Sequence, residues 1–238
     1  MAQKSKQWAA IIMMIALFAM IAFVTNLCSP MATIVKNQFG ASELAGQIGN
    51  YANFIAYLVM GIPSGMLIAK LGYKKTALLA LIVGIVGIVF EYLSGVVGSY
   101  VIYLVGAFIS GLCMCMLNTV VNPLLNVLGG GGKTGNQLIQ IGGAANSAAA
   151  VAVYILMGAL IGEVTKSTGI SDATPALIIA GVIFVIAFVI LLFTKIEEPE
   201  QAKVELSRFD CFGILADDVR WPFNRWQYRW QGKQPCNG

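Results

Sequence analysis

The chain has 238 residues, of which 58% are hydrophobic and only 11% are charged, and its formal net charge is +4. Soluble domains carry about 25% charged residues, and a soluble fold of this size exposes much of its chain to water. This composition therefore predicts an integral membrane protein. The chain contains no histidine, which removes the commonest general base and zinc ligand. We expect no enzymatic activity, no metal, no cofactor and no nucleic-acid partner.

Six apolar runs are long enough to cross a lipid bilayer, which takes about 20 residues in a helix. Helices are predicted for all of them, because an open sheet cannot satisfy the hydrogen bonds of its edges in lipid. The predicted fold class is an all-α membrane protein, a bundle of six transmembrane helices formed by residues 1–200. The runs cover residues 8–29, 46–69, 76–97, 100–128, 137–162 and 175–194.

The lysines are distributed unevenly between the two ends of this predicted bundle. Only Lys36 and Lys166 fall on one side, and the positive-inside rule assigns the lysine-rich side to the cytoplasm. We therefore predict a multi-pass protein of the inner (plasma) membrane with both termini cytoplasmic. The lysine-rich side holds Lys4, Lys6, Lys70, Lys74, Lys75, Lys133, Lys195 and Lys203.

Residues 201–238 are predicted to form a separate cytoplasmic tail, because their composition differs from that of the six runs. This segment holds all four arginines and three of the four tryptophans of the chain. One interpretation is a tail that rests on the anionic inner leaflet through these side chains. The other interpretation is that a frame change in the coding sequence produced the segment.

Small residues occur in the third, fourth and fifth runs at positions that predict close helix contacts. Small residues let helix backbones approach closely in lipid, and those singled out are Gly84, Gly87, Gly106, Gly111, Gly142 and Gly143.

The loop between the second and third runs contains the most specific pattern in the chain. Gly65, Lys70, Gly72 and Lys74 resemble the cytoplasmic signature loop of the major facilitator superfamily. We therefore predict that these four residues form a conformational loop. Ala69 stands where that family usually has an acidic residue, so the charge relay proposed for the loop is not supported here.

A second pattern resembles one group within that superfamily, the fucose/glucose/galactose permeases. The fourth run carries Asn118 and an Asn122-Pro123 pair before Leu128-Gly129, and the fifth run carries Asn146-Ser147. The two resemblances together cover residues 8–195. They imply the amino-terminal half of a permease, in which two six-helix halves enclose the substrate and rock against each other.

The resemblance implies transport of a small polar solute, a monosaccharide, by alternating access. The expected partners are the sugar, the lipid bilayer, and either a separate second half or a second copy of the chain in a homo-dimer. We interpret the chain as a truncated half of a sugar permease. The alternative is a membrane-embedded interaction protein, or an inactive fragment without transport activity.

Amide side chains inside the spans are the candidate substrate ligands. Amides both donate and accept hydrogen bonds, which suits sugar hydroxyls, but they also join helices to one another. Asn118 and Asn122 are four residues apart and share one face of a helix. The predicted substrate-binding residues are Asn26, Asn53, Asn118, Asn122, Gln140 and Asn146.

Acidic residues are almost missing from the spans. The two acidic positions of the sugar–proton symporters in the permease group fall on Ser29 and Asn118, and neither side chain exchanges a proton near neutral pH. Proton coupling through these two positions is therefore not supported. Glu91 remains inside the third run, and we considered either a functional role or an interfacial residue that reaches water.

Overall fold

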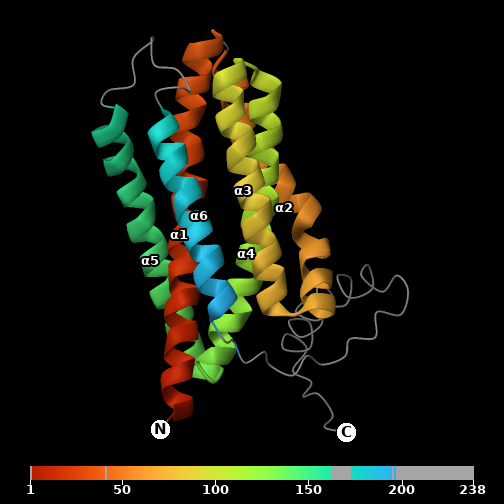
Figure 1. Cartoon of the computed structure of the whole chain (residues 1–238), viewed down its shortest axis with the longest axis vertical. Coiled ribbons are helices and arrows are strands. Elements are labelled where there is room, and N and C mark those ends of the chain that lie inside the picture. Colours follow the sequence, from red (N-terminus) through yellow and green to blue (C-terminus); the bar gives the residue numbers. More distant parts are fainter. Residues whose placement is uncertain (1, 41, 162–172, 195, 197–238) are drawn as a thin grey trace, which may run out of the picture. The chain divides into compact units, whose positions relative to one another are not determined.

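The computed structural model of the chain describes residues 2–40, 42–161, 173–194 and 196 (Figure 1). This part of the chain forms six helices, and each is long and apolar enough to cross a membrane. The predicted six-helix fold is confirmed, whereas the tail 201–238 lies outside the described residues. The helices are α1 (Ala2–Phe39), α2 (Glu43–Leu71), α3 (Tyr73–Val97), α4 (Tyr100–Leu128), α5 (Gly132–Ile161) and α6 (Thr174–Phe193).

Short polar or glycine-containing turns separate the helices. Ser42 caps the start of α2 by accepting a hydrogen bond from the backbone N–H of Ala45 at 3.3 Å. Gly98 ends α3 in the left-handed conformation at φ 68°, which glycine adopts without steric cost. Gly72 joins α2 to α3 at φ 87° and ψ 170°, a backbone conformation that residues other than glycine rarely adopt.

Helix α1 is longer than the sequence analysis predicted. The expected end at residue 29 is wrong, because the helix continues through Pro30 to Phe39. Proline removes one backbone donor and bends a helix, but membrane helices tolerate it because neighbouring groups satisfy the freed carbonyl. The apolar span of α1 accordingly runs from Trp8 to Gln38.

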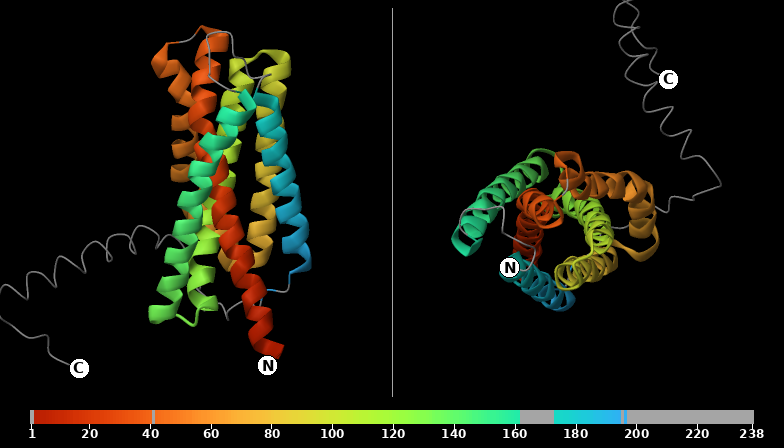
Figure 2. Two further views of the ribbon diagram at one scale, coloured as in Figure 1. Left: turned by 90° about the vertical axis from the view of Figure 1, so that its left-hand side faces the viewer. Right: turned by 90° about the horizontal axis from the view of Figure 1, so that it is seen from above.

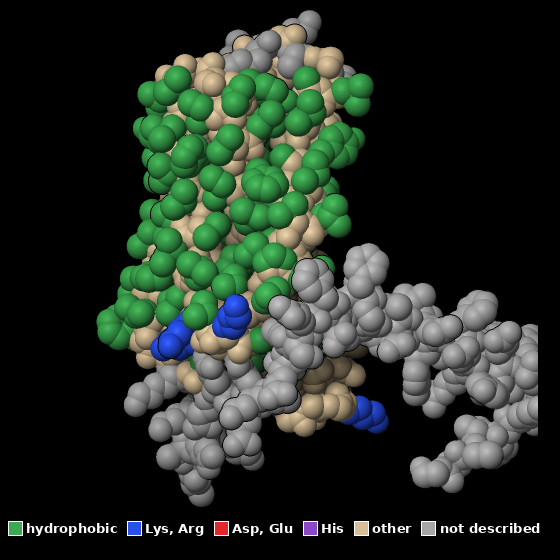
Figure 3. All heavy atoms as spheres, turned by 90° about the vertical axis from the view of Figure 1, so that its right-hand side faces the viewer, with side chains coloured by type: hydrophobic (Ala, Val, Ile, Leu, Met, Phe, Trp, Pro, Cys, Tyr) green, Lys and Arg blue, Asp and Glu red, His purple; other side chains and the backbone are tan. Residues whose placement is uncertain are grey.

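The helices alternate in direction, so the junctions fall at two ends of the bundle. Figures 1 and 2 show the start of α1, the α2–α3 junction and the α4–α5 turn at the lower end. Lys70, Lys74 and Lys75 flank the α2–α3 junction and Lys133 lies in the first turn of α5, whereas Lys36 lies near the upper end of α1. The face in Figure 3 is otherwise hydrophobic, with its basic side chains near the lower end.

Helix α4 is the centre of the bundle and contacts α1, α2, α3 and α5. Its buried side chains, including Met114, Leu117 and Leu124, join a core shared with α1, α3 and α6. The predicted close contacts of glycine are confirmed except at Gly143, where a Cβ would meet nothing within 4 Å. A Cβ on Gly87 would lie 2.8 Å from the backbone nitrogen of Ser110, so α3 and α4 touch backbone to backbone there.

Helix α5 lies at the edge of the bundle, as the view from above in Figure 2 shows. In the most apolar 18-residue stretch of α5 only 11% is buried, against 56% in that of α4. Its exposed side chains include Gln137, Gln140 and Ser147, which share one face at helical spacing. Hydrocarbon chains solvate these polar side chains poorly, whereas the upper half of α5 exposes Val151, Tyr154 and Ile155.

Candidate functional site

The strongest polar cluster lies where α4 faces α2. The side-chain nitrogen of Asn118 donates a hydrogen bond to the Tyr57 hydroxyl at 2.8 Å. One turn further along α4, Asn122 donates to the backbone oxygen of Asn118 at 3.0 Å. All three side chains are half-buried. The structure therefore brings the two predicted amides together and adds a phenol hydroxyl, which keeps its own proton for another acceptor.

Two hydroxyl side chains extend this cluster between the same helices. The oxygens of Ser64 on α2 and Thr119 on α4 are 3.0 Å apart. Pro123 cannot donate a backbone hydrogen bond to the carbonyl of Thr119, one turn before it in α4. Amide, phenol, hydroxyl and carbonyl groups thus lie within one stretch of α2 and α4, and such a set can bind a polyhydroxylated solute.

Asn26 and Asn53 occupy different environments from this cluster. Asn26 is half-buried on α1 and donates to the carbonyl of Ala22 in its own helix at 2.8 Å. Asn53 is 5% exposed and donates to the sulfur of Cys28 at 3.4 Å. A Cβ on Gly111 would lie 2.7 Å from the side-chain oxygen of Asn53. Asn53 therefore lies in the contact of α1, α2 and α4.

The two predicted substrate-binding residues of α5 also lie in different environments. Gln140 is exposed on the outer face of the helix. Asn146 is half-buried and donates to the backbone oxygen of Phe18 at 3.1 Å, which joins α5 to α1. The six predicted residues thus divide into the α4 pair, two amides that bridge helices, Asn26 on α1 and an exposed glutamine.

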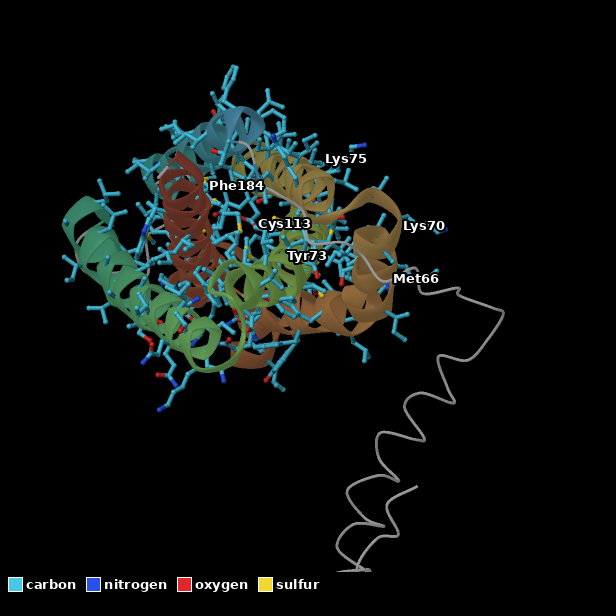
Figure 4. The ribbon with its side chains drawn as sticks, turned by 90° about the horizontal axis from the view of Figure 1, so that it is seen from below. Met66, Lys70, Tyr73, Lys75, Cys113 and Phe184 are labelled. Atoms are coloured by element: carbon cyan, nitrogen blue, oxygen red, sulfur yellow. The ribbon has the colours of Figure 1, made fainter. Side chains whose placement is uncertain are left out.

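The predicted conformational loop lies at the lower end of the bundle. In Figure 4 the side chains of Lys70 and Lys75 point away from the helices. Lys74 instead donates to the backbone oxygens of Leu192 and Thr194 at 2.9 and 2.8 Å. These carbonyls belong to the end of α6, where a helix has unpaired acceptors and partial negative charge. Lys74 therefore ties the start of α3 to the end of α6.

Replacing Lys74 with alanine is expected to destabilise the contact between α3 and α6. Hydrogen bonds from a charged donor contribute about 1.5–3 kcal/mol, and partial exposure lowers this here to about 1–2 kcal/mol. Thermal unfolding of the purified protein in detergent measures the loss. Lys75→Ala is the matched control, because Lys75 is the next residue and is exposed. Equal losses in both variants would show that the bonds to α6 contribute nothing.

Glu91 does not reach water as an interfacial residue, and that expectation is wrong. Its side chain is only 6% exposed, and it accepts a hydrogen bond from the Ser110 hydroxyl at 3.0 Å. The sequence placed it near the end of α3 but could not show that this face of α3 packs on α4.

Metal ligands do not gather in the described part of the chain, where no three His, Cys, Asp or Glu side chains form a group. Cys28, Cys113 and Cys115 are buried free thiols in this part. Cys113 lies against Gly84 near Phe184 (Figure 4), so it acts there as a small packing residue.

Comparison with known proteins identifies the family. The sequence profile described as Major Facilitator Superfamily matches residues 12–228. The chain belongs to the Major Facilitator Superfamily. This membership confirms the resemblance found in the signature loop, and a family of membrane transporters agrees with the prediction that the chain is not an enzyme.

Among curated members of the superfamily, the chain is similar to sugar transporters. It is 22% identical over 215 residues to a glucose/galactose transporter of Brucella abortus, covering 90% of this chain and 50% of that protein. It is 23% identical over 218 residues to the L-fucose-proton symporter of Escherichia coli, covering 82% of this chain and 50% of the symporter. The chain spans about half the length of these curated relatives.

Solved structures of the superfamily show the same helical arrangement. The E. coli fucose:proton symporter in its outward conformation superposes with a TM-score of 0.68 at 20% sequence identity, over 80% of this chain and 50% of that chain. A variant of the same symporter with one substitution gives a TM-score of 0.64 at 20% identity, over 78% and 49% of the two chains. The fold is therefore half of a major facilitator fold.

Sequence reasoning missed several functional candidates in this superfamily member. Ser64 and Thr119 were not singled out, and the contact of Lys74 with α6 was not foreseen. Ser64 lies seven residues after Tyr57, which places both on one face of α2. That spacing could have predicted that Tyr57 and Ser64 lie on the same side of α2. Their partners on α4 could not be predicted, because they depend on how the two helices pack.

Proposed function

We propose that the chain is one six-helix half of a sugar transporter and that a monosaccharide binds beside Asn118 and Asn122. The observation that carries the proposal is the cluster of Asn118, Tyr57, Ser64 and Thr119 between α2 and α4. Neutral groups that both donate and accept suit sugar hydroxyls, and they avoid the cost of burying a charge. The named activities of the glucose/galactose and fucose relatives support the same substrate class.

A second six-helix unit is proposed to complete the transporter. The exposed polar face of α5, with Gln137, Gln140 and Ser147, favours a protein partner over lipid on that side. The partner is either a separate second half or a second copy of this chain. Rocking of the two units about a site between them then exposes the sugar alternately to each side.

The proposed orientation has the lower end of the bundle in the cytoplasm of a cell with an inner (plasma) membrane. This end carries Lys70, Lys74, Lys75 and Lys133, whereas the upper end carries Lys36. Excess lysine marks the cytoplasmic side of a membrane protein. Both termini of the chain would then be cytoplasmic.

Sugar uptake by proteoliposomes tests the proposal. The purified chain is reconstituted over a range of protein-to-lipid ratios, and entry of radiolabelled glucose, galactose and fucose is measured against empty liposomes. Uptake that rises steeply with protein density supports transport by paired copies. Uptake that appears only after a second half is co-reconstituted supports a separate partner. No sugar uptake and no sugar binding under either condition would contradict the function and favour an interaction protein.

A further inference from the structure

Glu91 carries a carboxyl group that is enclosed by helix backbones on the inner side of α3. A Cβ on Gly106 would lie 2.8 Å from the Cγ of Glu91 and 2.9 Å from its backbone nitrogen. The Glu91 side chain therefore packs directly against Gly106 of α4. The enclosure leaves 6% of Glu91 exposed, although Glu91 is only six residues before the end of α3.

In the described part of the chain, the hydrogen-bond donor to this carboxyl group is a neutral hydroxyl. Ser110 donates to Oε1 at 3.0 Å, and Ser94 donates to the backbone oxygen of Glu91 at 2.7 Å. α2, α4 and α6 pack on α3; the sequences of α4 and α6 contain no lysine and no arginine, and the lysine of α2, Lys70, lies in its last turn at the lower end. An ionised carboxylate buried without a cation is costly, whereas a protonated one is tolerated. The site therefore suits a carboxyl group that gains and loses a proton.

Within the described residues, the titratable groups that interact with the charge of Glu91 lie on α1 and α4. Tyr103 on α4 and Cys28 on α1 lie close enough to interact with its charge, and both are neutral acids. α6 contains no titratable side chain.

The Glu91–Ser110 contact lies next to a second contact of α4, because Ser110 and Gly111 are consecutive residues. Ser110 is followed in α4 by Gly111, which packs on the side chain of Asn53. Asn53 in turn donates to Cys28 on α1 at 3.4 Å. The contact of Glu91 with α4 therefore directly adjoins the place where α1, α2 and α4 meet at Asn53.

We propose that Glu91 is a proton-binding site inside the membrane and that its protonation controls the packing of α3 on α4. A hydronium ion at the upper end transfers one proton to a carboxylate oxygen of Glu91, so that one O–H bond of hydronium breaks, one O–H bond forms on Glu91 and water is left. Release returns the proton to water as hydronium. A second part of the proposal rests on the proposed sugar transport: the proton bound by Glu91 is the ion that is transported together with the sugar.

Infrared difference spectroscopy of the reconstituted protein tests proton binding without any assay of transport. Spectra recorded from about pH 6 to pH 9, where exposed carboxyl groups stay ionised, are expected to show the carbonyl band of a protonated carboxylic acid, which shifts in D2O. Glu91→Gln should remove this band. Glu43→Gln is the matched control at the first residue of α2, and it should keep the band. A band that survives Glu91→Gln, or the absence of any such band in the unmodified protein, overturns the proposal.

Ser110→Ala provides a second test that does not depend on the folding of Glu91→Gln. Ser110 donates to the carboxyl group, and losing this donor disfavours the ionised form. The band is therefore expected to persist to higher pH in Ser110→Ala and to return toward its original midpoint in Ser110→Thr. An unchanged midpoint in Ser110→Ala overturns the assignment.

The coupling part is tested separately in proteoliposomes that show sugar uptake. An imposed pH gradient should accelerate uptake at least about tenfold in the unmodified protein and not in Glu91→Gln. Equal acceleration in both would remove the coupling role while leaving the proton site intact. If no sugar is taken up but the band titrates, the proposed function fails and the proton-binding site stands.

Discussion

Gly87→Ala and Gly111→Ala are each expected to lower the stability of the bundle by about 2–3 kcal/mol, near the upper end of what overpacking usually costs. A Cβ on Gly87 would lie 2.8 Å from the backbone nitrogen of Ser110. A Cβ on Gly111 would lie 2.8 Å from the backbone oxygen of Asn53. Backbone atoms cannot move aside as the end of a side chain can, so whole helices must separate. Thermal unfolding in detergent, followed by size-exclusion chromatography, measures both losses.

Gly143→Ala is the control for these two variants. Gly143 also lies inside a helix, but nothing stands within 4 Å of a Cβ placed on it. Alanine has a higher helix propensity than glycine by about 1 kcal/mol, so this change should be neutral or stabilising. The packing argument fails if Gly143→Ala destabilises the protein as much as Gly87→Ala does.

The helices were predictable because lipid imposes a simple requirement on the chain. Any segment that crosses the membrane must satisfy its backbone internally and be about 20 residues long, and both properties can be read from composition. The end of α1 was not predictable in this way. A proline predicts the end of a helix in water, whereas Pro30 is accommodated inside α1.

The candidate site was predictable only where it depends on one helix. Asn118 and Asn122 share a face because they are four residues apart, and the structure keeps them together. Their partner Tyr57 lies on α2, and no spacing rule relates positions on two different helices. The same limit explains Glu91, whose burial depends on Gly106 of the next helix.

The packing glycines show what sequence could and could not supply. Gly84 and Gly142 both lie inside apolar runs rich in small residues. The structure gives each a contact in the bundle, with Phe184 for Gly84 and Phe18 for Gly142, whereas Gly143 faces open space. Composition thus predicts that close contacts exist, and three-dimensional packing decides which glycine makes them.

Asn118→Ala is expected to weaken sugar binding at least about tenfold and to lower the uptake rate to match. The substitution removes a donor and an acceptor, and it also deprives the Tyr57 hydroxyl of the hydrogen bond it accepts at 2.8 Å. Leaving buried polar partners unsatisfied costs about 1–3 kcal/mol, which is about a 5-fold to 150-fold loss of affinity. Equilibrium binding of labelled sugar to the purified protein measures this directly.

The control for this variant is Asn136→Ala, which removes the same amide from an exposed position near the start of α5. Binding should be unchanged there. Tyr57→Phe separates the two contributions of the pair, because it removes the hydroxyl and leaves Asn118 in place. If sugar bonds to Asn118 alone, Tyr57→Phe should have little effect, whereas a shared site predicts a loss close to that of Asn118→Ala. Equal binding by Asn118→Ala and Asn136→Ala would place the sugar away from this cluster.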